Sequence, residues 1–168
     1  MKIILCVDER AGYSFNKRRQ SRDIKMREHM LGVLREEGAE LLLNSYTERS
    51  MLKDAGLFTE QERAGREACP AKDGDGFLEI AKKKNCWAFV ENEDISPYYG
   101  YIDEMIIYRW NRLYLSDLHL SDSFLSKFVC VERGSFKGSS HDEISFERLR
   151  RKEKAMQGAG DMAFGGAE

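Results

Sequence analysis

Charged and amide side chains follow four short apolar segments of this 168-residue chain, at positions 8–10, 44–47, 91–94 and 109–112. These residue types can do chemistry. Carboxylates act as general bases, arginines bind phosphate or carboxylate through paired N–H donors, and amides supply both donors and acceptors. In open α/β sheets, ligands collect beyond the carboxyl ends of the strands. We therefore expect a binding site where these four segments meet.

A basic loop before the first predicted helix carries the densest positive charge, with Arg18 and Arg19 at its centre. Arginine side chains near a helix start suit an anion such as a nucleotide phosphate. The alternative is a solvated loop that pairs with surface acids. The loop lacks the glycine pattern of a P-loop. Its charge is also compatible with weak, salt-sensitive RNA binding, because phosphate contacts need only positive charge.

The segment 109–112 combines two arginines with an aromatic ring and an amide. Arg109 and Arg112 could hold an anion, while Trp110 stacks on a ring of the ligand. Alternatively, Trp110 belongs to the core and one arginine pairs with a buried carboxylate such as Glu91. The predicted ligand-binding residues are Arg18, Arg19, Asn44, Asn92, Arg109, Trp110, Asn111 and Arg112.

Glu91 and Asp8 are the candidates for a catalytic general base, because each comes directly after an apolar segment. Consecutive acids on one loop seldom converge on a cation, so we predict neither a metal nor another cofactor. The pattern favours a protein that binds a small anionic ligand, a nucleotide or phosphorylated metabolite, at the carboxyl ends of its strands. Hydrolase or transferase chemistry is compatible with these residues, but they identify no reaction. The alternative is a non-catalytic interaction protein whose charged clusters are structural ion pairs.

Ser140 and His141 are adjacent, but neighbours in sequence do not make a catalytic triad, whose members meet in space. Ser140 with Glu143 matches a capping box and predicts a helix from about residue 142 to 156. His29 and His119 have no partner at metal-ligand spacing, so a zinc site is not expected.

Five short apolar segments predict strands at 2–7, 39–43, 86–90, 105–108 and 128–131, the last antiparallel at an edge. Between the first two, a stripe of Ile24, Arg27, Leu31 and Leu34 predicts a helix that Asp23 caps and Gly38 ends. Strand, helix and strand with short joins predict a parallel pair. Other helices are expected at 47–55, around 60–67, at 77–84 and as one turn at 97–101, with a loop at 10–20.

Together these elements predict one three-layer α/β domain over residues 1–156, with a mostly parallel sheet of four or five strands and helices on both faces, followed by a flexible tail at 157–168. A chain of this length can bury roughly 70% of its unfolded surface. The net charge of −2 argues against a dedicated nucleic-acid or membrane-surface protein. The four cysteines form no C-x-x-C pair, and no leader or membrane span is apparent, so we expect reduced thiols and a cytoplasmic location.

Four motifs resemble a family of short, uncharacterised proteins from Gram-positive gut bacteria. They are FNKRRQSRD at 15–23, FVEN at 89–92, IYRWNR at 107–112 and FKGSSH at 136–141. The resemblance covers about residues 1–150, and the family often carries the name ribonuclease Z. That nuclease binds two zinc ions through an H-x-H-x-D-H motif, whereas the three histidines here stand far apart. We therefore expect no zinc-dependent RNA cleavage.

The length, and an opening strand followed by a long loop, are also similar to dihydrofolate reductases. The glycine pair that approaches the phosphates of the nicotinamide cofactor in that family has no counterpart here. This resemblance therefore implies a similarity of fold and no shared activity.

Overall fold

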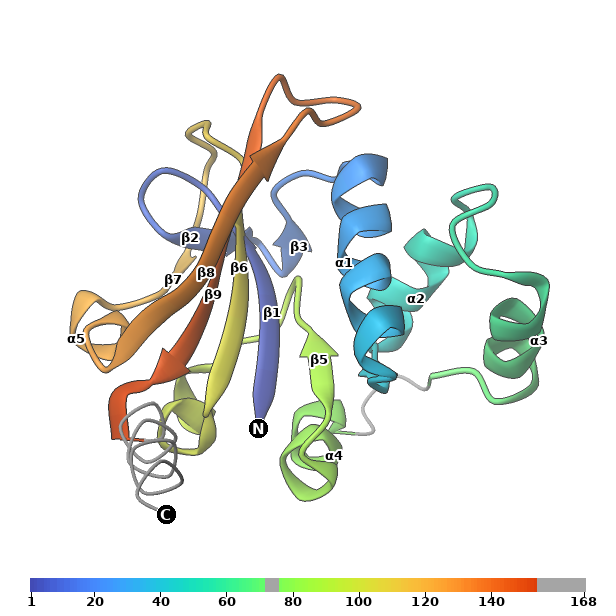
Figure 1. The fold of residues 1–168 in the computed structure, drawn as a ribbon, viewed down its shortest axis with the longest axis horizontal. Coiled ribbons are helices and arrows are strands. Elements are labelled where there is room, and N and C mark those ends of the chain that lie inside the picture. Colours follow the sequence, from blue (N-terminus) through green and yellow to red (C-terminus); the bar gives the residue numbers. More distant parts are fainter. Residues whose placement is uncertain (72–75, 154–168) are drawn as a thin grey trace, which may run out of the picture.

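The computed structural model describes residues 1–71 and 76–153, and its centre is a six-stranded sheet with helices packed against it (Figure 1). In spatial order the strands are β4 (Leu41–Leu42), β5 (Trp87–Phe89), β1 (Lys2–Val7), β6 (Glu104–Arg109), β9 (Ile144–Arg151) and β8 (Phe128–Phe136). The first four are parallel, and β9 and β8 are added antiparallel. The predicted α/β class and mostly parallel sheet are confirmed, with six strands in place of four or five.

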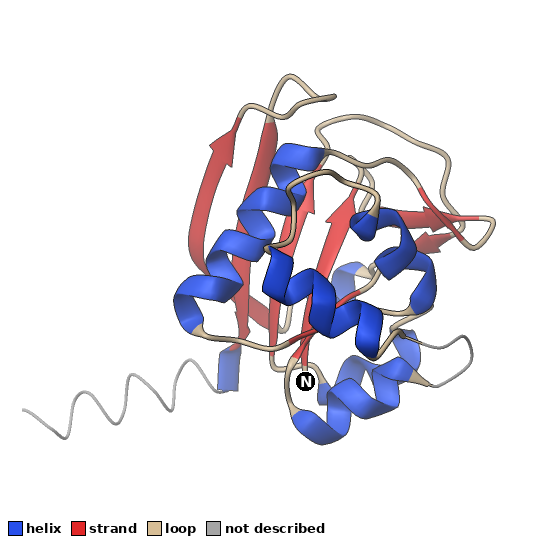
Figure 2. Cartoon of the chain, turned by 90° about the vertical axis from the view of Figure 1, so that its right-hand side faces the viewer, coloured by secondary structure: helices blue, strands red, loops and turns tan. Residues whose placement is uncertain are grey.

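The central strand β1 is buried on both sides because helices cover both faces of the sheet (Figure 2). Ile3 and Leu5 point into one apolar cluster, which also contains Phe77 of helix α4. Ile4 points into the other, which contains Met30 of α1. The helices are α1 (Ile24–Glu37), α2 (Ser45–Leu52), α3 (Glu60–Ala68), α4 (Phe77–Lys84), α5 (Asp122–Leu125) and the 3₁₀ helix η1 (Ser96–Tyr101).

Helix α1 begins and ends as its caps predict. The Asp23 carboxylate accepts the Met26 N–H at 3.2 Å, and Gly38 ends the helix at φ 60°. The N-terminal cap of α2 differs from the prediction, because the N-cap residue is Asn44 and not Thr47. Its side chain accepts the Thr47 N–H at 3.0 Å, which starts α2 two residues early.

The predicted loop at 10–20 is wrong in part, because it contains a β-hairpin of β2 (Gly12–Phe15) and β3 (Arg18–Arg19). Asn16 and Lys17 form its two-residue turn with φ of 50° and 58°. Positive φ at both central residues is typical of the turn that matches the twist of a hairpin. Strand β2 also pairs with β7 (Leu118–His119) in a small second sheet.

The predicted helix at 142–156 is wrong over residues 144–151, which form strand β9. The Ser140 N–H and hydroxyl group bind the Asp23 carboxylate at 2.8 and 3.1 Å, so Ser140 caps no helix of its own. Ile144 and Leu149 then enter the two different apolar clusters, as strand residues of opposite parity do. The pairing partner β9 also extends β8 to residue 136, beyond the predicted edge strand at 128–131. Positions 154–156 of that helix and the predicted tail at 157–168 lie outside the described residues.

Among the helices of the described residues, none is long and apolar enough to cross a membrane. The four cysteines are free thiols, with Cys86 buried and Cys69 exposed. No C-x-x-C arrangement exists in the sequence, and the structure brings no disulfide together in its described part.

Candidate functional site

The carboxyl ends of β1 and β5 lie beside four charged residues that form the strand-end cluster: Arg19, Arg27, Asp54 and Glu91. The Arg19 Nε lies 3.1 Å from both carboxylate oxygens of Glu91. The Arg27 Nη1 lies 2.7 Å from Asp54 Oδ2, and its Nη2 lies 3.6 Å from Glu91 Oε2. Two cations face two anions, so the cluster offers no excess positive charge to an anionic ligand.

Two members of the strand-end cluster, Arg27 and Asp54, were not predicted as site residues. Arg27 is only 1% exposed, although it carries a full charge. A sequence signal for it exists, because Arg27 interrupts the apolar stripe of α1. A charge on the buried stripe of a helix needs a buried partner. Asp54, which follows α2, carries no comparable signal.

The Asp8 carboxylate organises the turn after β1. Its Oδ1 accepts the backbone N–H groups of Arg10 and Gly12, each at 2.9 Å. Its Oδ2 accepts Gln20 Nε2 at 3.0 Å and the Tyr114 N–H at 3.4 Å. The acceptor positions of this predicted base are therefore occupied by groups of the protein itself.

The two predicted asparagines, Asn44 and Asn92, do lie together. The Asn44 Nδ2 donates to Asn92 Oδ1 at 2.8 Å and to Glu93 Oε2 at 2.7 Å. The same Asn44 side chain caps α2, so its amide already has partners on both sides. The pair joins the carboxyl ends of β4 and β5.

Of the segment 109–112, only Trp110 lines a cleft together with Arg19 and Glu91 of the strand-end cluster. Arg109 Nε lies 3.4 Å from Glu147 Oε1 on β9, and Glu91 pairs with Arg19 instead, so the alternative that pairs an arginine of this segment with Glu91 does not hold for Arg109. Strand β9, which was predicted as a helix, pairs with β6 and brings Glu147 beside Arg109. Asn111 donates to the Glu143 carbonyl at 3.1 Å. Arg112, like Arg18 on the hairpin, is exposed.

Trp110 belongs to the core, as the alternative interpretation had it. It is 2% exposed and stacks on His141 with ring centroids 4.5 Å apart. His141 in turn lies with its Nδ1 3.2 Å from Asp23 Oδ2 and its Nε2 2.9 Å from the Tyr114 hydroxyl. The Trp110 ring is therefore covered by His141, which Asp23 and Tyr114 hold in place. It is not open to stacking by a ligand's ring.

A cleft beside the strand-end cluster has a volume of only about 10 Å³. Gln20 and Trp110 line it, and the buried atoms Gln20 Oε1 and Trp110 Nε1 have no hydrogen-bond partner among the described residues. A volume of this size corresponds to about one water molecule. In this conformation the strand-end cleft therefore has no room for a nucleotide.

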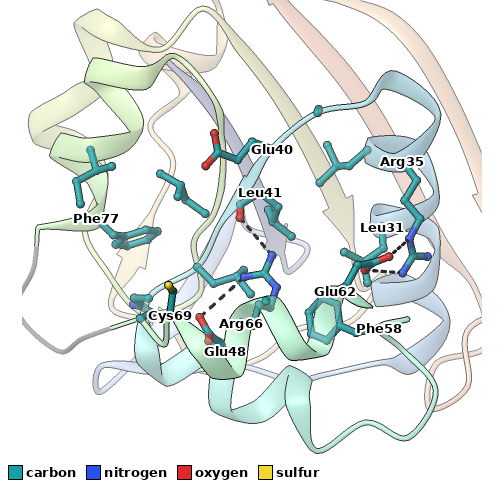
Figure 3. A pocket seen from close by; sticks show the side chains of 18 of the residues that line it. Leu31, Arg35, Glu40, Leu41, Glu48, Phe58, Glu62, Arg66, Cys69 and Phe77 are labelled. Atoms are coloured by element: carbon teal, nitrogen blue, oxygen red, sulfur yellow. Dashed lines mark hydrogen bonds and ion pairs between the residues drawn. The ribbon is translucent and has the colours of Figure 1, made fainter. Parts of the chain in front are cut away.

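A much larger hollow, which we call the β4 cavity, lies between β4, α1, α3 and α4 (Figure 3). Its volume of about 600 Å³ falls within the range of small-molecule sites. Its wall is largely apolar and includes Leu31, Leu34, Leu41, Leu43, Phe58 and Phe77. Asn44 is the predicted ligand residue that also lines it, at the carboxyl end of β4.

The charged residues that line the β4 cavity are Arg35, Glu40, Glu48, Glu62 and Arg66. Arg66 and Glu48 make no close mutual contact. Arg66 Nη2 donates to the Leu41 carbonyl at 3.2 Å, while its Nη1 lies 3.9 Å from Glu48 Oε2. The guanidinium also lies over the Phe58 ring, 4.9 Å from its centre. Burial lowers the pKa of Arg66, against the opposing influence of Glu48 and Glu62. Arg66 is thus a partly desolvated cation with donor capacity to spare.

Helix α3 forms the polar side of the β4 cavity, and none of its nine residues is buried. Arginines attach it to the rest of the protein. Arg35 of α1 pairs with Glu62 at 2.9 Å, and Arg63 donates to the Leu52 carbonyl at 2.7 Å. A helix normally packs an apolar stripe on the core. Here the space that such a stripe would fill is the cavity.

Arg66 was not singled out in the sequence, because the stretch around α3 shows no apolar periodicity. Glu48, on α2, was not singled out either. The described residues contain no group of three or more histidine, cysteine, aspartate or glutamate side chains that could hold a metal ion.

Comparison with known proteins shows a similarity of fold but identifies no family. No family model and no curated protein matches the chain. A solved structure of dihydrofolate reductase from Enterococcus faecalis, complexed with NADP(H) and RAB-propyl, is similar with a TM-score of 0.54 and 12% identity. The match covers 90% of this chain and 95% of that one. The similarity of fold expected from the opening strand and loop is confirmed.

Proposed function

We propose that the protein binds a small molecule with an apolar body and an anionic group, and that the β4 cavity holds it. One observation carries this proposal. A cavity of about 600 Å³ has an apolar wall and a half-buried arginine, Arg66, whose nearest carboxylate is 3.9 Å away. Cavities of this size and composition, with few polar groups, are the usual form of a ligand site.

The anionic group would bind at Arg66. A guanidinium presents paired N–H donors that match a carboxylate or a phosphate, and charge-assisted hydrogen bonds are about twice as strong as neutral ones. The apolar wall lowers the local dielectric constant, which strengthens this attraction. The body of the ligand would lie on Leu31, Leu34 and Phe58, all of which line the cavity.

This site modifies the hypothesis derived from the strand ends. The β4 cavity reaches the carboxyl end of β4 through Leu43 and Asn44, so a nucleotide or phosphorylated metabolite remains within the proposed class. The strand-end cluster itself, with Arg27, Asp54 and Glu91 paired and buried, supports a structural role. We assign no reaction to either place.

A ligand screen with three variants tests this function. Thermal shifts would be measured with nucleotides, sugar phosphates, aromatic carboxylates, fatty acids and short apolar peptides that have a free carboxyl terminus. A binder at 100 times its Kd should stabilise the protein by about 2.7 kcal/mol. Arg66→Leu should weaken binding of that compound at least tenfold. The substitution removes the one cationic residue of α3 that lines the cavity, and with it the partner of the ligand's anionic group. Glu48→Gln should tighten binding, since it removes the competing carboxylate.

The matched control is Arg63→Leu. Arg63 also lies on α3 and also donates to a backbone carbonyl, but it does not line the β4 cavity. Its replacement should cost similar stability and leave the affinity unchanged. Equal loss of affinity in both variants, or no stabilising compound in the whole screen, would overturn the proposed function.

A further inference from the structure

We propose that the ligand of the β4 cavity is a short apolar peptide with a free carboxyl terminus, which adds as a strand to the open edge of β4. This inference rests on the proposed function and names the ligand class for that site. Three features of the cavity support it: the backbone of β4, the placing of the apolar residues and the position of Arg66.

Strand β4 ends the sheet, and its far edge faces the cavity. All six residues from 39 to 44 line the cavity. The Trp87 N–H donates to the Glu40 carbonyl at 3.3 Å, so the backbone of Glu40 faces β5. Because backbone groups alternate in direction along a strand, Leu41 faces the other way, toward the cavity.

The Leu41 carbonyl shows what this edge binds. Arg66 Nη2 donates to it at 3.2 Å, from the side where a neighbouring strand would place its N–H groups (Figure 3). A peptide offers such N–H groups at regular spacing, and peptide recognition by strand addition draws its affinity from main-chain hydrogen bonds. A fatty acid or an aromatic carboxylate offers none to this edge.

The apolar residues are arranged for a strand as well. Leu31, Leu34 and Phe58 belong to the apolar cluster on the α1 face of the sheet. Phe77 belongs to the cluster on the opposite face, and it lines the same cavity. Side chains of an added strand would point alternately to these two faces, so apolar residues would be accommodated at successive positions.

The length of the edge limits the peptide. At about 3.3 Å per residue, the six residues of β4 and its flanks span about 20 Å, and a peptide of about four residues spans about 13 Å. Its terminal carboxylate would then accept from Arg66, in the charge-assisted geometry described above. The bound peptide would extend the sheet by a seventh strand next to β4.

Isothermal titration of the full chain with matched peptides tests this inference. The probe is an acetylated tetrapeptide of alternating valine and leucine with a free carboxylate. Two further peptides carry N-methyl groups on either the odd or the even amides. Only one set of N–H groups can face β4, so one methylated isomer should bind at least tenfold more weakly and the other should bind nearly as well as the probe. Hydrogen exchange at Leu41 and Leu43, whose backbone groups face the cavity, should slow when the probe binds.

Two more comparisons locate the carboxylate and separate this inference from the proposed function. The amidated tetrapeptide should bind at least tenfold more weakly than the acid, and Arg66→Leu should abolish that difference while Arg63→Leu preserves it. Equal binding of both methylated isomers would overturn the strand addition. If dodecanoate binds through Arg66 and the tetrapeptide does not, the peptide inference fails and the proposed function stands. If neither binds and the earlier screen is silent, both fail.

Discussion

Replacing Arg27 by methionine should lower the free energy of unfolding by about 3–5 kcal/mol, the largest loss we expect from any single substitution in this protein. Arg27 is 1% exposed, and it contacts the buried carboxylates of Asp54 and Glu91. Methionine fills much of the same space but leaves Asp54 without its cation. A buried charge without a partner is costly, because water no longer solvates it. Urea denaturation at pH 7 measures the loss.

The matched control for this prediction is Arg109→Met. Arg109 and its partner Glu147 are each 30% exposed, and their closest contact is 3.4 Å. Such an exposed pair contributes about 0–1 kcal/mol. The double variant R27M/D54L should recover part of the loss, because the uncompensated charge is removed as well. Similar losses for Arg27→Met and Arg109→Met would show that the strand-end cluster is not the structural ion-pair network described here.

Replacing Asp23 by asparagine should cost about 2–4 kcal/mol at pH 7, and the cost should shrink in acid. Asp23 is 2% exposed and joins two distant segments. Its carboxylate accepts the backbone N–H groups of Met26, Ser139 and Ser140 at 3.2, 3.0 and 2.8 Å, and contacts His141. Asparagine has only one acceptor oxygen in place of the two carboxylate oxygens. Its NH₂ group would face the N–H groups that now donate to Asp23.

The pH dependence follows from the pKa of Asp23. Burial by itself would raise that pKa, but hydrogen bonds from Ser139, Ser140, His141 and Met26 outweigh burial and hold the pKa well below its usual value. A carboxyl group with a lowered pKa in the folded state stabilises fully above its unfolded pKa of about 3.9. The stabilisation is lost as the pH falls below that value, because the unfolded chain then takes up the proton first.

Urea denaturation of both proteins from pH 7 to pH 3 tests this prediction. The difference between the original protein and Asp23→Asn should stay constant down to about pH 5 and narrow below about pH 4. Asp142→Asn is the control, since Asp142 is exposed, and it should change stability by less than about 0.5 kcal/mol throughout. A difference that widens toward acid pH would contradict the assignment of a lowered pKa to Asp23.

Short-range patterns in the sequence were sufficient for much of the fold. The apolar segments predicted β1, β5 and β6, and the caps Asp23 and Gly38 predicted α1 within a few residues. These features depend on side chains close to one another along the chain, and so does the strand–helix–strand pattern that implies a parallel pair. The location of polar residues at strand ends was also visible, because it follows from the order of the elements.

Tertiary structure decided the features that depend on partners far apart in the chain. Ser140 and Glu143 matched a helix cap, yet Ser140 binds Asp23, 117 positions away, and the following residues pair with β6 and β8. The hydrogen bonds of two long strand pairings outweigh one local cap, which is worth about 1 kcal/mol.

The same reason separates the predicted site from the observed one. The type of each charged residue was visible in the sequence, but its partner was not, because Arg27, Asp54 and Glu91 come from three elements that meet only on folding. The β4 cavity has even less local signal. It exists because a polar helix, α3, is attached by arginines beside an open sheet edge and leaves the apolar wall uncovered. Local sequence determined the strands and their caps, whereas the space between elements arose only when distant segments packed together.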